Sequence, residues 1–129
     1  MAMRTPKEMK LHETIIRSVA GIYDSRKIAH QQILTNLERP DAVLKGITVD
    51  IIVKNPITLI FKVETETSVT EGEAIAWKAI SEQLGTFFLL IPHPLKADAM
   101  KIIAKTGLKN VRLCYYMIMD NKLKFMSLP

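Results

Sequence analysis

The sequence predicts an α/β protein whose mixed β-sheet carries helices on both faces. Two apolar, β-branched segments, 47–53 and 57–66, are joined by a short turn containing Pro56, which is typical of an antiparallel hairpin. A later run, 86–91, is apolar throughout, as expected of a strand covered on both faces. Amphipathic helical segments precede and separate these strands. An antiparallel pair followed by helix-linked strands implies a mixed sheet.

The first third of the chain predicts one helix and leaves a second segment open. Apolar residues recur at helical spacing from Leu11 to Ile22, so we expect a helix over residues 6–20 that ends at Gly21. Residues 24–38 fit either a second helix or a strand, and the proline-containing segment 39–41 ends both alternatives.

The rest of the chain alternates strands and helices. Strands are expected at about 48–53 and 58–65. The segment 70–73 has the form of a capping box and opens a helix that stops at Gly85. The strand 86–91, a helix over 95–106 closed by Gly107, the strand 111–119 and a short last strand over 123–126 complete the prediction.

Length and composition are those of one globular domain spanning residues 1–129, with 48% hydrophobic residues. The first seven residues lack the apolar core of a signal peptide, and no apolar run reaches membrane-spanning length, so we expect a cytoplasmic protein without a membrane partner. The single cysteine, Cys114, lies in an apolar run and is expected in the core. The net charge of +5 favours an anionic partner such as nucleic acid.

Ionisable residues stand in the two central strands, where a buried strand should be apolar. Asp50 lies within a β-branched run, and Lys62, Glu64 and Glu66 are spaced two apart, so they share one strand face. A buried carboxylate is costly unless it is paired, hydrogen-bonded or bound to a cation. These charges therefore predict a functional site, and a metal-ion site is the leading hypothesis.

This order of elements, with these charges, resembles the PD-(D/E)XK nuclease-like superfamily, which has the restriction-endonuclease fold. The superfamily places an acid near the end of its second core strand and an acid-x-lysine motif on the third. Asp50 matches the first acid, and the segment 61–66, Phe-Lys-Val-Glu-Thr-Glu, stands where the second motif is expected. The resemblance is best over residues 47–92. It implies a three-layer αβα sandwich with a central mixed sheet and a restriction-endonuclease-like core.

The second motif departs from the superfamily pattern because Lys62-Val63-Glu64 reverses the order of acid and lysine. Both side chains still share one face, so the two residue types could have exchanged strand positions. Two other matches stay open. A glutamate, Glu66, could replace the lysine, or Asp41 could supply the literal proline-aspartate. We prefer Asp50 because it is embedded in a strand.

The resemblance implies that Asp50, Glu64 and Lys62 are catalytic residues and that Mg²⁺ or Mn²⁺ is the cofactor. Asp50 and Glu64 would bind the metal with Glu13 of the first helix, for which Glu8 is the alternative. A hard cation neutralises the scissile phosphate and activates water, and oxygen ligands suit it. The lysine would orient the water or stabilise developing charge.

The expected function is therefore a Mg²⁺-dependent nuclease that hydrolyses phosphodiester bonds of DNA, with RNA left open and a homodimer possible. The alternative is a catalytically inactive nucleic-acid-binding or structural module on the same fold, which the reversed motif favours. A third hypothesis is an α/β domain unrelated to nucleases. Trp77 is expected in the core and Lys78 in solvent.

Overall fold

The computed structural model describes residues 4–129. In chain order its elements are α1 (Pro6–Ser25), β1 (Gln32–Thr35), β2 (Val43–Leu44), β3 (Ile47–Thr48), β4 (Ile51–Lys54), β5 (Leu59–Val63), α2 (Ala74–Leu84), β6 (Phe87–Pro92), the 3₁₀ helix η1 (His93–Leu95), α3 (Lys96–Thr106), β7 (Val111–Met119) and β8 (Lys122–Met126). Residues 1–3, which belong to the N-terminal segment that lacks the apolar core of a signal peptide, lie outside this range.

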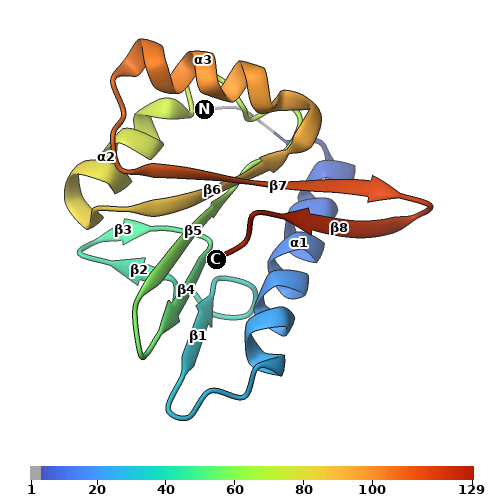
Figure 1. Cartoon of the computed structure of the whole chain (residues 1–129), viewed down its shortest axis with the longest axis vertical. Helices are drawn as coiled ribbons and strands as arrows, with labels where there is room; N and C mark the ends of the chain where they lie inside the picture. The colour runs from blue at the N-terminus through green and yellow to red at the C-terminus, as the bar shows by residue number, and fades with distance from the viewer. Residues whose placement is uncertain (1–3) are drawn as a thin grey trace.

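The main sheet is mixed, and its strand order across the described residues is β1-β4-β5-β6-β7-β8. β1, β4 and β5 form an antiparallel meander, β6 and β7 continue parallel to β5, and β8 returns antiparallel to β7. Figure 1 shows the sheet curling, with β4 and β5 steep in the view and β6, β7 and β8 lying across it. The predicted mixed α/β class is confirmed.

Two clusters of buried side chains form the core. One joins α1 to the sheet and contains Tyr23 and Phe61, and the other joins α2 and α3 to the sheet around Trp77. The strand β6 contributes to both clusters, with Leu90 in the first and Leu89 in the second. This confirms that the apolar run over 86–91 is a strand buried on both faces. Cys114 is fully buried, as predicted.

The helix α1 is longer than predicted because it continues through Gly21 to Ser25. Its start follows from Thr5, whose hydroxyl accepts a hydrogen bond from the backbone N–H of Glu8 at 3.2 Å. A glycine within a helix costs about 1 kcal/mol. The extra turn buries Tyr23 against Phe61, with ring centroids 5.6 Å apart, and such burial contributes about 2 kcal/mol, which exceeds that cost.

Pairing between strands explains two differences from the prediction, one in the ambiguous segment 24–38 and one in the strand expected over 48–53. Residues 32–35 form a strand because they pair with β4, so the second helix is absent from residues 24–38. The strand expected over 48–53 is split. Lys45 and Gly46 both have positive φ and close a small β2–β3 hairpin, after which β4 begins at Ile51. Asp50 therefore lies at the entrance to β4 instead of inside a strand.

The strand expected over 58–65 is shorter than predicted and runs from Leu59 to Val63, because the chain turns away from the sheet after Glu64 and Glu66 lies on the following loop. The helices and the later strands follow the prediction more closely. Thr70 Oγ1 accepts a hydrogen bond from the N–H of Glu73 at 3.2 Å, as in the predicted capping box. The helix itself begins later than predicted, since its N-cap is Glu73 and not Thr70, and α2 starts at Ala74. Gly85 and Gly107 end α2 and α3, both with positive φ. The strand 111–119 has the predicted bounds. Among the described residues, no helix combines the length and apolarity needed to cross a bilayer.

Candidate functional site

Asp50, at the entrance to β4, lies beside Lys62 of the neighbouring strand β5. Ile51 pairs with Phe61, so one step further along the antiparallel register Asp50 comes opposite Lys62, with both side chains on one face. The Lys62 Nζ is 3.5 Å from Asp50 Oδ2, and the same oxygen accepts the N–H of Val63 at 2.6 Å. Only 12% of the Asp50 side chain is exposed.

Glu64 follows directly after β5 and is fully buried. Its Oε1 accepts hydrogen bonds from Arg4 Nη2 at 2.9 Å and from Ser68 Oγ at 2.8 Å. Its Oε2 accepts one from Trp77 Nε1 at 2.7 Å and lies 3.8 Å from Lys62 Nζ. Both oxygens of the carboxylate are thus held by donors from the protein itself.

Lys62 is therefore the cation that links the two carboxylates. Burial alone would lower the pKa of Lys62, but Asp50 and Glu64 outweigh it and raise that pKa. Burial pushes the pKa of Asp50 upward, yet His12, Lys62 and the Val63 N–H together hold it below its usual range. Burial raises the pKa of Glu64, and Lys62 and its hydrogen-bond donors offset part of that rise.

The residue that α1 contributes to Asp50 is His12 and not Glu13. His12 Nε2 lies 3.3 Å from Asp50 Oδ1, and it makes no well-formed hydrogen bond to any described residue. Glu13 is exposed, because one residue along a helix turns the side chain by about 100°. The structure does not bring Glu13 to Asp50 and Glu64. Sequence spacing gave no sign of His12, since its partner stands on a distant strand.

Arg4 is the second residue that the sequence did not reveal. Besides Glu64, its guanidinium donates to Thr65 Oγ1 at 3.0 Å and to the Val63 carbonyl at 3.2 Å. These bonds hold Arg4, two residues before α1, against the end of β5. An arginine in an N-terminal segment carries no sequence pattern that would connect it to a strand about sixty residues away.

Glu8, the alternative ligand, is engaged next to this site but not in it. Its Oε2 accepts hydrogen bonds from Thr65 Oγ1 at 2.9 Å and from the hydroxyl and N–H of Thr67 at 2.8 and 3.2 Å. The Thr67 and Thr65 bonds lower the pKa of Glu8 to about 2. Glu8 therefore anchors the start of α1 to the loop after β5.

The lowered pKa of Glu8 predicts an acid-sensitive contribution to stability. Because the carboxylate is favoured in the folded state, its contribution is full above about pH 4.5 and is lost as pH falls toward 2. With solvent screening, we expect Glu8→Gln to be about 1–2 kcal/mol less stable than wild type at pH 7. Urea unfolding at pH 7 and pH 3 should show this difference shrinking by more than half. An unchanged difference would contradict it, and Glu13→Gln serves as the control.

The remaining candidates lie apart from the linked carboxylates. Asp41 is exposed and lines a groove with Arg17 of α1. Glu66 is exposed on the loop after β5. Trp77 is buried, as predicted, and its indole N–H also donates a hydrogen bond to Glu64. Lys78 is exposed, as predicted, and pairs with Glu82 at 3.9 Å.

The observed donors do not fit a divalent metal held by Asp50 and Glu64. Mg²⁺ requires oxygen ligands at about 2.1 Å with free lone pairs. The Glu64 oxygens already accept their hydrogen bonds, and Lys62 Nζ lies between the two carboxylates. Within residues 4–129, no group of three or more His, Cys, Asp or Glu side chains is arranged to hold a metal ion.

The arrangement is thus a buried network of two carboxylates, Lys62 and Arg4, with His12 at its edge. It can hold α1, β4, β5 and α2 together, and it presents Asp50 and His12 next to the partly exposed edge of Lys62. Comparisons of this chain with protein-family models, with curated proteins and with solved structures find no match.

Proposed function

We propose that this protein is a nucleic-acid-binding module with a nuclease-like fold, in which the ammonium group of Lys62 replaces the divalent cation. The single observation that carries the proposal is the position of Lys62 Nζ, 3.5 Å from Asp50 and 3.8 Å from Glu64. The net charge of +5 supports a polyanionic partner.

The fold supports the nuclease-like part of this proposal. The helix α1, the antiparallel meander β1-β4-β5, the crossover helix α2 and the parallel strand β6 follow in the order that the superfamily's core requires. The α1 side and the α2–α3 side of the sheet each have their own core cluster, as a three-layer αβα sandwich would. The short β2–β3 hairpin lies between β1 and β4 in the chain and pairs within itself.

Charge balance supports the non-catalytic part. The positive charges of Lys62 and Arg4 neutralise the two carboxylates without an external ion. A hydrolytic metal site instead needs an excess of negative charge and open coordination positions for water and phosphate. The reversed Lys62-Val63-Glu64 motif thus has a physical consequence, since it places an internal cation between the acids.

A Mg²⁺-dependent nuclease is the second candidate, and one specific observation favours it. Asp50 just before β4 and Glu64 just after β5 converge on the same point, Lys62 Nζ. If Lys62 and Arg4 moved away on binding DNA, the two carboxylates could hold a metal, and the lysine would be free to assist an attacking water. The same experiment distinguishes the two candidates.

The test measures binding and cleavage together. Labelled single-stranded, duplex and branched DNA, and a single-stranded RNA, would be incubated with the protein in Mg²⁺, Mn²⁺ or EDTA, beside Asp50→Asn and Glu64→Gln, which preserve side-chain size. We expect binding that is unchanged by EDTA and weakens as salt rises, with no cleavage in any metal.

Metal-dependent cleavage that both substitutions abolish would replace the proposal with the nuclease. Absence of binding to all three DNA forms and to an RNA strand would reject both candidates. In that case the domain would have to be assigned to another function, as the third hypothesis holds.

A further inference from the structure

The net positive charge of the chain is confined to its last quarter. Residues 96–129 contain seven lysines and arginines against two aspartates, whereas residues 1–95 contain eleven basic and eleven acidic residues. The basic segment is α3 with the β7–β8 hairpin. The Asp50–Lys62–Glu64 network lies in the part of the chain that is electrically balanced.

A groove between α3 and β7 gathers part of this charge. Its volume is about 740 Å³, and it is lined by Lys96, Lys109 and Arg112 over an apolar floor that includes Met100 and Tyr115. None of the described residues that line it is acidic. Met100 is 53% exposed, and Lys96 Nζ lies 5.4 Å from the centre of the Tyr115 ring.

The β7–β8 hairpin continues the basic surface beyond the groove. Tyr115 pairs with Met126, Met117 with Lys124 and Met119 with Lys122, so these side chains share the face on which Tyr115 stands.

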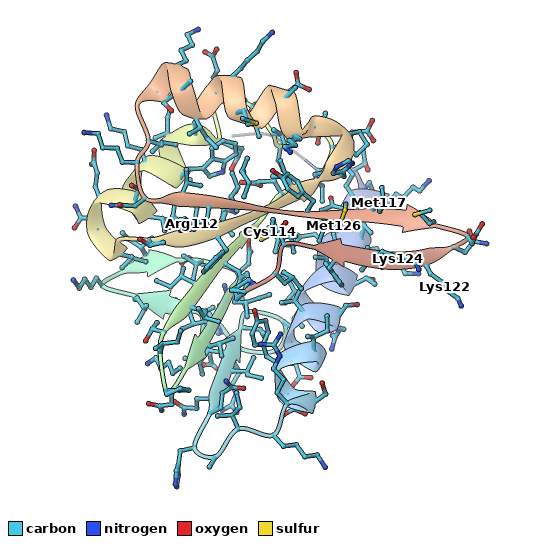
Figure 2. The ribbon with its side chains drawn as sticks, viewed as in Figure 1. Arg112, Cys114, Met117, Lys122, Lys124 and Met126 are labelled. Carbon is cyan, nitrogen blue, oxygen red and sulfur yellow. The ribbon has the colours of Figure 1, made fainter. Side chains whose placement is uncertain are left out.

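Figure 2 shows Arg112 near the start of β7 and Lys122 and Lys124 on the hairpin's other strand. At about 3.3 Å per residue, the nine residues of β7 give this surface a length of about 30 Å. Lys105 points elsewhere, since it pairs with Glu71 at 2.8 Å.

We infer that the surface made by the α3–β7 groove and the β7–β8 hairpin binds single-stranded nucleic acid. Lys96, Lys109 and Arg112 at the groove and Lys122 and Lys124 on the hairpin would contact the phosphates, and Tyr115 and the exposed methionines would offer apolar and aromatic contact to unstacked bases. A duplex presents its bases inside and would leave this apolar floor unused. The inference rests on the proposed function and assigns it to a surface other than the Asp50 network.

The test uses a fluorescein-labelled oligothymidylate of about 15 nucleotides, a length within the range that such surfaces cover. Anisotropy would be measured with wild type and with the triple variant Lys109→Gln/Arg112→Gln/Lys124→Gln. We expect the triple variant to bind about 10- to 100-fold more weakly. The slope of log affinity against log salt should fall by about 0.7 for each phosphate that the variant no longer neutralises. Tyr115→Ala should weaken binding about 10-fold with the slope unchanged.

The matched control is Lys10→Gln/Lys27→Gln/Lys45→Gln, which removes the same charge from exposed positions outside the basic segment. It is expected to bind within about 3-fold of wild type. Equal weakening in both triple variants would overturn the inference in favour of general electrostatic attraction. If Lys109→Gln/Arg112→Gln/Lys124→Gln keeps its affinity but aggregates more than wild type, these cations serve to prevent the exposed edge of the sheet from pairing with other chains, and the inference is wrong. Failure of wild type to bind the oligothymidylate and the DNA and RNA forms named above would reject the proposed function itself. A strict preference for duplex DNA over the oligothymidylate would reject the single-strand assignment alone.

Discussion

Replacing Glu64 with leucine is expected to lower the free energy of unfolding by about 3–5 kcal/mol, because a buried ion pair that loses one partner leaves the other uncompensated. The substitution removes the acceptor for Arg4, Ser68 and Trp77 together, and it removes one of the two counter-charges of Lys62. Leucine approximates the volume of glutamate, so cavity formation adds little. Urea or guanidinium unfolding at pH 7 measures the effect directly.

Glu66→Leu is the matched control. Glu66 is two residues further along and exposed, so the same chemical change there should alter stability by less than about 0.5 kcal/mol. A Glu64→Leu variant within about 1 kcal/mol of wild type would show that the network is energetically neutral and that its cations are well solvated without Glu64.

Lys62→Met is expected to destabilise the protein by a similar amount, about 3–5 kcal/mol, when divalent cations are chelated. Methionine retains most of the aliphatic stem but removes the charge between Asp50 and Glu64. The buried carboxylates of Asp50 and Glu64 then repel each other, and the pKa of at least one of them must rise. Unfolding followed in EDTA gives the size of the loss.

Addition of Mg²⁺ or Mn²⁺ should recover part of the stability of Lys62→Met and none in wild type. A cation that binds only the folded state stabilises it by about 2.7 kcal/mol at a hundred times its dissociation constant. Lys78→Met, which removes an exposed lysine paired with Glu82, should show neither loss nor rescue. Equal effects of metal on both variants and wild type would contradict the idea that Lys62 occupies a cation position.

Several elements could be predicted from local sequence because their signals are local. The strand 86–91 is apolar throughout, and Gly85 and Gly107 end helices where positive φ is required. The helix end predicted at Gly21 was wrong for a tertiary reason, since burial of Tyr23 outweighs the glycine. The break between β3 and β4 was missed because the Lys45-Gly46 turn is a weak signal inside a β-branched run.

Local sequence patterns were sufficient to predict the mixed α/β class, and the two-residue spacing predicted that Lys62 and Glu64 share a face. The strand expected to carry them ends at Val63, so Glu64 lies just beyond it, and the position of Asp50 opposite Lys62 became clear from the register of β4 and β5. The partners of these three side chains could not be predicted from the sequence. The tertiary structure brought Arg4 and His12 from the N-terminal region and Trp77 from α2, and it left Glu13 in solvent. Such partners depend on how a helix rotates against a sheet and where an N-terminal segment docks. Those arrangements are fixed by packing of the whole core and leave no periodic trace in the chain.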